Sequence, residues 1–312
     1  MASTDDYSHG VDDDHTGHVH ANGDFGFAFA IGTTLNLGFV VVEATYGLLS
    51  NSMALLADAG HNLSDVIGLL VAWGATILAK RKPDGRYSYG LRSSSIVAAL
   101  FNAVFLLVAI AIIAIEAVQR FAEPADVAGK TVIVVATIGI VINTVTALMF
   151  MRGGKQDINI RGAFLHMAAD AAVSAGVVIA GFVILATGWV WVDPVVSLAI
   201  VAVIAIGTWG LLRDSVNLSL HATPPGIEAQ AVSDYLNELP GVAAIHDLHI
   251  WAMSTTETAL TVHLVLSGGY PGDSFARNIA IALKTNFGIH HPTMQIETEG
   301  GGDCALEPDH VV

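Results

Sequence analysis

Six long apolar stretches occupy the middle of this chain, and each is long enough to cross a lipid bilayer as a helix. A spanning helix needs about 20 mostly apolar residues to cross about 30 Å of hydrocarbon. The composition agrees, because 13% of the 312 residues are charged, whereas a soluble protein has about 25%. The stretches predict an all-α membrane bundle of six helices and exclude a soluble globular enzyme. They lie near residues 25–49, 53–79, 91–120, 131–151, 161–187 and 190–212.

Lysine and arginine are concentrated in alternate connections between these stretches. The connection after the second stretch contains five of them, from Lys80 to Arg92, and the region after the fourth contains Arg152, Lys155 and Arg161. Basic connections mark the cytoplasmic side of a membrane protein. Since both termini fall on that side, we expect a multi-pass protein of a bacterial-type inner (cell) membrane, with both termini in the cytoplasm.

The region from Asp214 onward has a different character, because it contains twelve of the 28 acidic residues and no long apolar stretch. Its hydrophobic periodicity predicts the order α-β-β-α-β, which is typical of a small α+β domain of the ferredoxin-like type. The chain is therefore divided into four parts. These are a disordered tail rich in His and Asp (1–24), a six-helix membrane domain (25–213), a cytoplasmic domain (214–300) and a C-terminal tail (301–312).

The charge and the cysteine count exclude several classes of partner. The net charge is −15, and no basic stripe is present that would neutralise phosphates, so we expect no nucleic-acid partner. The single cysteine, Cys304, excludes an internal disulfide and a CxxC zinc site. No sequence motif indicates an organic cofactor.

Two pairs of ionisable residues interrupt the apolar stretches. His61 and Asp65 lie four residues apart in the second stretch, and His166 and Asp170 repeat that spacing in the fifth, so each pair shares one helix face. Each Asp at mid-membrane costs at least about 2.5–3.5 kcal/mol, which a bound cation offsets. Two imidazoles and two carboxylates suit tetrahedral Zn²⁺, with Co²⁺ and similar ions as competitors. The pairs therefore predict a shared metal site, and the simpler alternative is a hydrogen bond within each pair.

Other polar residues in the apolar stretches indicate a function less specifically than the two His–Asp pairs do. Glu43 and Asp58 are candidates for a second shell around the metal or for a hydrophilic path to it. Hydrogen bonding between helices is the alternative role of such residues. The same two roles apply to Asn36, Asn102, Glu116 and Asn143.

Four sequence motifs resemble those of the cation diffusion facilitator family. They are SMALLADAGHNLSD at 52–65, Tyr89-Gly90 with Arg92, AFLHMAAD at 163–170 and HDLHIW at 246–251. The resemblance extends over residues 25 to about 300, and it is strongest to the efflux proteins that confer resistance to cobalt, zinc and cadmium.

The resemblance implies a homodimeric transporter, not an enzyme, that exports divalent cations from the cytoplasm in exchange for protons. It implies chiefly Zn²⁺, with Co²⁺ and Cd²⁺ as further cargo, carried at His61, Asp65, His166 and Asp170. It also implies a second, regulatory Zn²⁺ site in the cytoplasmic domain. The matching positions there are His246, His263 and Glu297, with His249 as a rival.

Two other functions remain open from the sequence. A membrane metal sensor would bind zinc without transporting it, and a membrane redox protein would use His61 and His166 as haem ligands. Cys304 is a candidate for a further ligand, although a free thiol is the simpler interpretation. The four histidines of the N-terminal tail are candidates for loose metal capture.

Overall fold

The computed structural model describes residues 23–79, 81–151, 158–299, 304 and 306. The predictions of disorder and metal capture in the N-terminal tail fall almost entirely on residues 1–22, which lie outside the described part of the chain.

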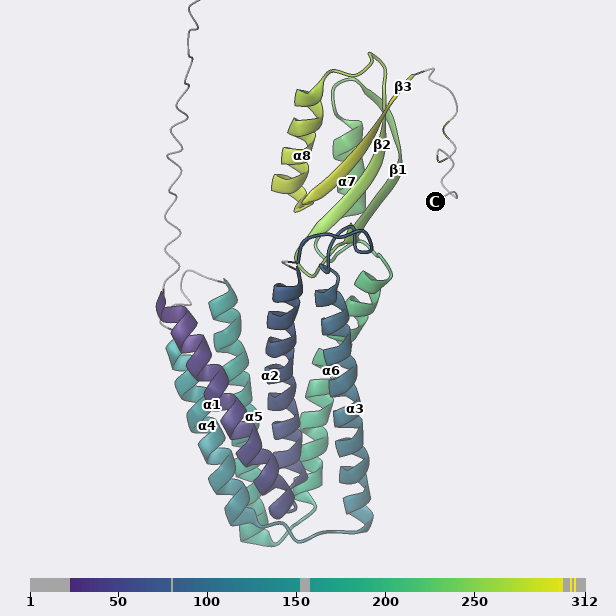
Figure 1. Ribbon diagram of the computed structural model, residues 1–312. Helices are drawn as coiled ribbons and strands as arrows, with labels where there is room; N and C mark the ends of the chain where they lie inside the picture. Colours follow the sequence, from purple (N-terminus) through teal and green to yellow (C-terminus); the bar gives the residue numbers. More distant parts are fainter. Residues whose placement is uncertain (1–22, 80, 152–157, 300–303, 305, 307–312) are drawn as a thin grey trace, which may run out of the picture.

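Long helices form the membrane domain and run side by side (Figure 1). Four of them, α3 to α6, are long and apolar enough to cross a membrane, whereas α1 contributes an apolar segment, Thr34–Leu49, that is shorter than a span. The described residues therefore support a multi-pass protein, and the count of six spans stays a prediction. The helices are α1 (Gly23–Leu49), α2 (Met53–Ala79), α3 (Ser94–Ala122), α4 (Gly129–Met151), α5 (Ile158–Thr187) and α6 (Val192–Ser219).

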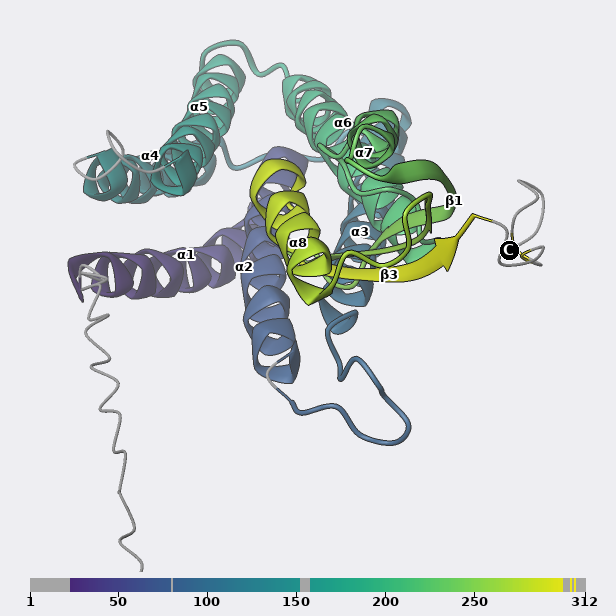
Figure 2. The same ribbon diagram turned by 90° about the horizontal axis from the view of Figure 1, so that it is seen from above.

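The helices form two groups, α1 with α4 and α5, and α2 with α3 and α6. The two groups lie close at the end away from the soluble domain and diverge toward it (Figures 1 and 2). Close packing joins the first group at Gly139 of α4, where an added Cβ would lie 2.7 Å from the Phe39 ring of α1 and 3.2 Å from Ser174 Oγ of α5. A side chain at this position would separate the helices, so glycine sets their spacing.

A buried aspartate of α6 determines where α2 begins. Asp193 is 1% exposed and accepts hydrogen bonds from Ser52 Oγ at 2.5 Å, Met53 N at 2.6 Å and Ala54 N at 3.4 Å. The first amides of a helix have no partner within the helix, and a carboxylate there also complements the helix dipole. The short connection between α1 and α2 is thereby tied to α6.

The soluble domain has the predicted order α-β-β-α-β. Its sheet has the strand order β1-β2-β3, with β1 antiparallel to β2 and β2 parallel to β3. The ferredoxin-like fold has a further strand before the first helix, which the described residues lack, so that assignment stays a prediction. The elements are α7 (Ala229–Asn237), β1 (Val242–Ala252), β2 (Thr258–Leu266), α8 (Asp273–Phe287) and β3 (His291–Thr298).

The hydrophobic face of this sheet packs against α7 and α8. Leu260, Val262 and Leu264 alternate along β2 and are fully buried against Leu236 of α7 and Leu283 of α8. The other face of β2 carries His263, as the period of two predicts.

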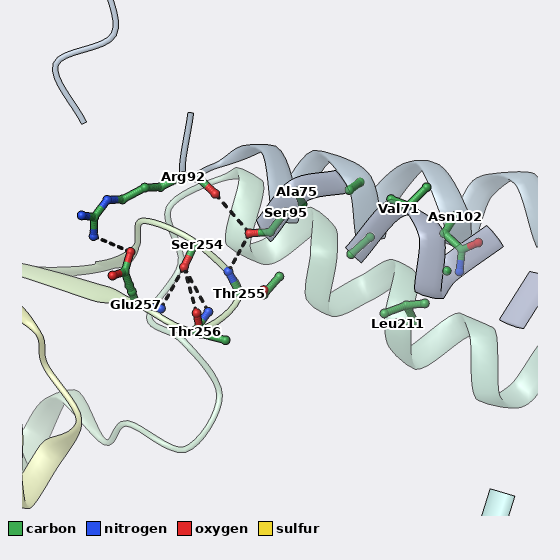
Figure 3. Close-up of a pocket in the computed structure, with 13 residues that line it drawn as sticks. Val71, Ala75, Arg92, Ser95, Asn102, Leu211, Ser254, Thr255, Thr256 and Glu257 are labelled. Carbon is green, nitrogen blue, oxygen red and sulfur yellow. Dashed lines mark hydrogen bonds and ion pairs between the residues drawn. The ribbon is translucent and has the colours of Figure 1, made fainter. Parts of the chain in front are cut away.

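Polar contacts join the soluble domain to the start of α3 (Figure 3). Arg92 forms an ion pair with Glu257 at 2.5 Å, and the Thr255 amide donates to Ser95 Oγ at 3.0 Å. A cavity of about 640 Å³ lies beneath these contacts, between α2, α3, α6 and the β1–β2 turn. The junction is polar and partly exposed, which is typical of an interface between domains that move relative to each other.

Candidate metal centres

The two His–Asp pairs of the membrane domain converge between α2 and α5. His61 Nε2 lies 3.4 Å from Asp170 Oδ1 and 3.8 Å from Asp65 Oδ2. His166 Nε2 lies 3.0 Å from Asp65 Oδ2 and 3.7 Å from Asp170 Oδ2. Each histidine therefore approaches the aspartate of the other helix more closely than its own, which favours a shared site over two separate pairs. We call these four residues the membrane metal set.

The spacing of the four donor atoms fits a tetrahedral metal ion. With metal–ligand distances of about 2.0–2.1 Å, the ligand atoms of a tetrahedral site lie about 3.3 Å apart. One donor atom from each of the four residues can be chosen so that all lie within 4.8 Å of one another. A small inward movement of the side chains would therefore complete a zinc site.

The membrane metal set is closed at one side and open at another. Asp170 is 2% exposed, whereas His166, which lies one turn nearer the start of α5, is 41% exposed. This gradient follows the divergence of the two helix groups toward the soluble domain (Figure 1). The arrangement can admit an ion from the side that faces the soluble domain.

Glu43 and Asp58 lie next to this set but do not hydrogen-bond to it within the described residues. Asn62 donates its amide to Glu43 Oε2 at 3.1 Å, and Ser174 Oγ donates to Asp58 Oδ2 at 2.9 Å. Sequence reasoning missed Asn62 and Ser174. Their helical spacing could have identified them, because Asn62 lies four residues after Asp58 and Ser174 lies four residues after Asp170, so each shares a helix face with a buried aspartate.

The remaining polar residues of the membrane helices have separate surroundings. Asn36 Nδ2 lies 3.6 Å from Met167 Sδ, which joins α1 to α5. Asn102 packs against Gly68 of α2. Asn143 is 1% exposed and makes no side-chain hydrogen bond with the described residues.

A second cluster lies on the open face of the soluble sheet. His246 Nε2 lies 3.0 Å from Glu297 Oε2, and His263 Nδ1 lies 3.0 Å from Glu297 Oε1. Cys304 Sγ lies 3.5 Å from His263 Nδ1, and donor atoms of these four residues all lie within 4.8 Å of one another. The structure therefore brings the three predicted positions together and adds the thiol.

A β-bulge orients His246 toward this cluster. The pairing of β1 with β2 shifts between His246 and His249, and Asp247 has a φ of 52°. Regular alternation would put His246 on the same face as Ile250, which is buried in the core. The extra residue reverses the alternation, so His246 lies opposite His263.

His249, the rival candidate, lies outside this cluster. It is 41% exposed, and its Nε2 lies 2.8 Å from Asp247 Oδ1. The other oxygen of Asp247 lies 3.5 Å from His263 Nε2. Asp247, which sequence reasoning missed, therefore contacts Nε2 of His263, the ring nitrogen that does not face Glu297.

Two pKa shifts describe the electrostatics of the soluble cluster. Partial burial would raise the pKa of Glu297, but hydrogen bonds from His246, Gln295 and Cys304 outweigh it and lower that pKa. A backbone hydrogen bond near Leu306 favours the Cys304 thiolate, but desolvation and the Glu297 carboxylate raise the pKa of the thiol. In the absence of a cation, the cluster therefore holds an ionised carboxylate beside a protonated thiol.

Comparison with known proteins agrees with this architecture. The model of the cation efflux transmembrane domain matches residues 29–218, and that of the cation efflux protein cytoplasmic domain matches residues 224–299. The chain belongs to the cation diffusion facilitator family, which is a family of metal transporters and not an enzyme class. The resemblance inferred from the four motifs is thus confirmed.

Several named relatives span most of this chain. It is 35% identical over 286 residues to the cadmium, cobalt and zinc/H(+)-K(+) antiporter of Bacillus velezensis, covering 90% of this chain and 91% of that protein. It is 36% identical over 276 residues to the zinc transporter ZitB of Pectobacterium atrosepticum, covering 87% and 86%. It is 33% identical over 283 residues to the metal cation efflux system protein CzcD of Cupriavidus metallidurans, covering 90% of each.

Proposed function

We propose that this protein exports divalent cations, chiefly Zn²⁺ and also Co²⁺ and Cd²⁺, from the cytoplasm in exchange for protons. The observation that carries the proposal is the convergence of His61, Asp65, His166 and Asp170 from two membrane helices. The names of the relatives, which include zinc, cobalt and cadmium transporters, support the same cargo.

The donor types favour zinc over the hard cations. Mg²⁺ and Ca²⁺ are bound mainly by oxygen atoms in sites of six or more ligands, whereas this set offers two imidazoles. Zn²⁺ and Co²⁺ accept mixed nitrogen and oxygen ligands.

Proton exchange supplies the driving force in this proposal. Moving two positive charges out against an inside-negative potential costs about 4.6 kcal/mol per 100 mV, from about 2.3 per charge. A histidine must be neutral to bind a metal, so protons and metal compete for the same nitrogen atoms. Protons that enter from outside would therefore displace the metal.

Alternating access follows from the two helix groups. In the proposed cycle, α1 to α6 all span the membrane, both termini are cytoplasmic, and the metal loads through the cytoplasmic opening. The groups then rock so that this end closes and the opposite end opens. The divergence of the groups in Figure 1 supports the inward-open state as one end of the cycle.

The soluble domain is proposed to form the contact of a homodimer and to respond to cytoplasmic zinc. His246, His263 and Glu297 would hold a regulatory Zn²⁺, and the donor set of imidazole and carboxylate fits that ion. Cys304 lies where a fourth ligand would lie. Metal at this cluster would draw the two soluble domains of the dimer together and favour loading of the membrane domain.

The geometry argues against the haem alternative. Carboxylate oxygens of both Asp65 and Asp170 lie within 3.8 Å of each histidine Nε2. The flat macrocycle would have to occupy the same space. The sensor alternative makes a different prediction, which is zinc binding without any zinc flux across the membrane.

Zinc entry into proteoliposomes tests the transport proposal. Vesicles with an acid interior and a zinc-sensitive dye should show gradient-dependent entry with the wild type. Asp65→Asn and His166→Ala should abolish it, while Asp126→Asn, which changes an exposed aspartate between α3 and α4, should not. Unchanged flux in both site variants would place the site elsewhere, and zinc binding without any wild-type flux would favour the sensor.

A further inference from the structure

A second group of buried polar residues lies one helical turn from the membrane metal set. Glu43 of α1 and Asp58 of α2, which we call the carboxyl pair, are both 0% exposed. Asn62 donates to one oxygen of Glu43, and Ser174 of α5 donates to one oxygen of Asp58. Three helices therefore contribute side chains to this buried polar site, and none of the four residues of the membrane metal set hydrogen-bonds to it in the described structure.

The other oxygen of each carboxyl group lacks a donor. Glu43 Oε1 and Asp58 Oδ1 are buried and accept no hydrogen bond from the described residues. The two carboxyl groups lie within hydrogen-bonding reach of each other. Two ionised carboxylates in contact repel, and burial removes the water that would screen them. Such a pair requires a cation between its members.

Within the described part of the chain, no lysine or arginine forms an ion pair with either carboxyl group. The sequences of α1 and α2 contain neither lysine nor arginine, and α4 carries no titratable residue after Lys130. The other titratable groups that act on the pair are His61 of α2 and Asp170 of α5, and neither hydrogen-bonds to it in the described structure. Asp170 adds further negative charge.

We propose that the carboxyl pair binds one proton, shared between Glu43 Oε1 and Asp58 Oδ1, as a proton site separate from the membrane metal set. One proton satisfies both unpartnered oxygens, because a carboxylic acid donates while the remaining carboxylate accepts. A hard metal ion fits poorly, since such ions take about six or more oxygen ligands and the pair offers two free ones.

The position of the pair gives the bound proton a role in exchange, and this part rests on the proposed transport function. Asp58 lies nearer than His61 to Met53, where α2 begins at the end away from the soluble domain (Figure 1). An ion that leaves the metal set outward passes the pair. A proton that enters from outside reaches the pair before the histidines. Proton binding there neutralises a negative charge of the carboxyl pair, which lies on the exit path, before the next metal ion is carried.

Infrared spectroscopy tests proton binding without relying on transport. Zinc-free, full-length protein at neutral pH should show the C=O stretch of a buried carboxylic acid. The band should be lost in Glu43→Gln and in Asp58→Asn and kept in the matched control Glu123→Gln, which changes an exposed glutamate. If the band is absent from the wild type, or remains in both pair variants, the proposal is wrong. Two pair variants are used so that misfolding of one does not decide the result.

Flux measurements test the role in exchange. Glu43→Gln should reduce several-fold the stimulation of zinc entry by an acid interior, relative to Glu123→Gln. Equal stimulation in these two variants would overturn the role in exchange. A wild type that shows the infrared band but no zinc flux would instead refute the proposed transport function and leave the proton site standing.

Discussion

Replacement of Asp193 by alanine is expected to loosen the start of α2 and to destabilise the whole membrane domain. The carboxylate is almost completely buried and receives two short hydrogen bonds, from Ser52 Oγ and Met53 N, and a longer one from Ala54 N. Alanine removes all three acceptor contacts and leaves the donors in a site closed to water.

The size of the effect follows from these contacts. A buried donor that loses its partner costs about 1–3 kcal/mol, and hydrogen bonds to charged groups lie at the upper end. Counting each short bond at about 1.5–2 kcal/mol and the longer one at no more than about 1 kcal/mol gives about 3–5 kcal/mol. At about 2 °C per kcal/mol for a chain of this size, the melting temperature should fall by about 6–10 °C.

The assay is thermal unfolding of the purified, metal-free protein in detergent. Asp214→Ala is the matched control, because it removes an exposed aspartate from the same helix. Asp193→Asn should give an intermediate shift, since the amide keeps one acceptor oxygen but presents an NH₂ group to a second donor. A shift for Asp193→Ala no larger than that of the control would refute the reasoning.

Further predictions concern packing, the domain junction, the soluble cluster and pH. Gly139→Ala should cost about 1–3 kcal/mol by overpacking against Phe39, while Gly176→Ala, where an added Cβ meets no atom within 4 Å, should be tolerated, as thermal unfolding would show. Arg92→Ala should change the stability by at most about 1 kcal/mol, because both members of its ion pair are more than a third exposed; a larger shift in melting temperature would contradict this. Cys304→Ser should weaken zinc binding at the soluble cluster, measured by calorimetry in a His166→Ala background. Zinc affinity of the membrane set should fall as the pH decreases, because protons compete with the metal for the histidine nitrogen atoms, and zinc titrations at several pH values would check it.

The sequence alone predicted the elements and the helix faces that carry the two His–Asp pairs, because both follow from short-range periodicity. Apolar stretches of helical length predicted long helices close to those observed. The spacing of four residues puts His61 with Asp65, and His166 with Asp170, on single helix faces whatever the rest of the chain does. In the soluble domain, the period of two in β2 correctly predicted the face that carries His263.

The tertiary structure decided the features that depend on distant residues or on a local irregularity. Strict alternation gives the wrong face for His246, because the bulge at Asp247 adds one residue to the strand. The capping of α2 by Asp193 joins positions about 140 residues apart, and the bond from Ser174 to Asp58 joins positions 116 apart. Periodicity carries no information about which helices become neighbours. The sequence therefore determined which side chains could act together on one helix, and only helix packing determined which of them meet across helices.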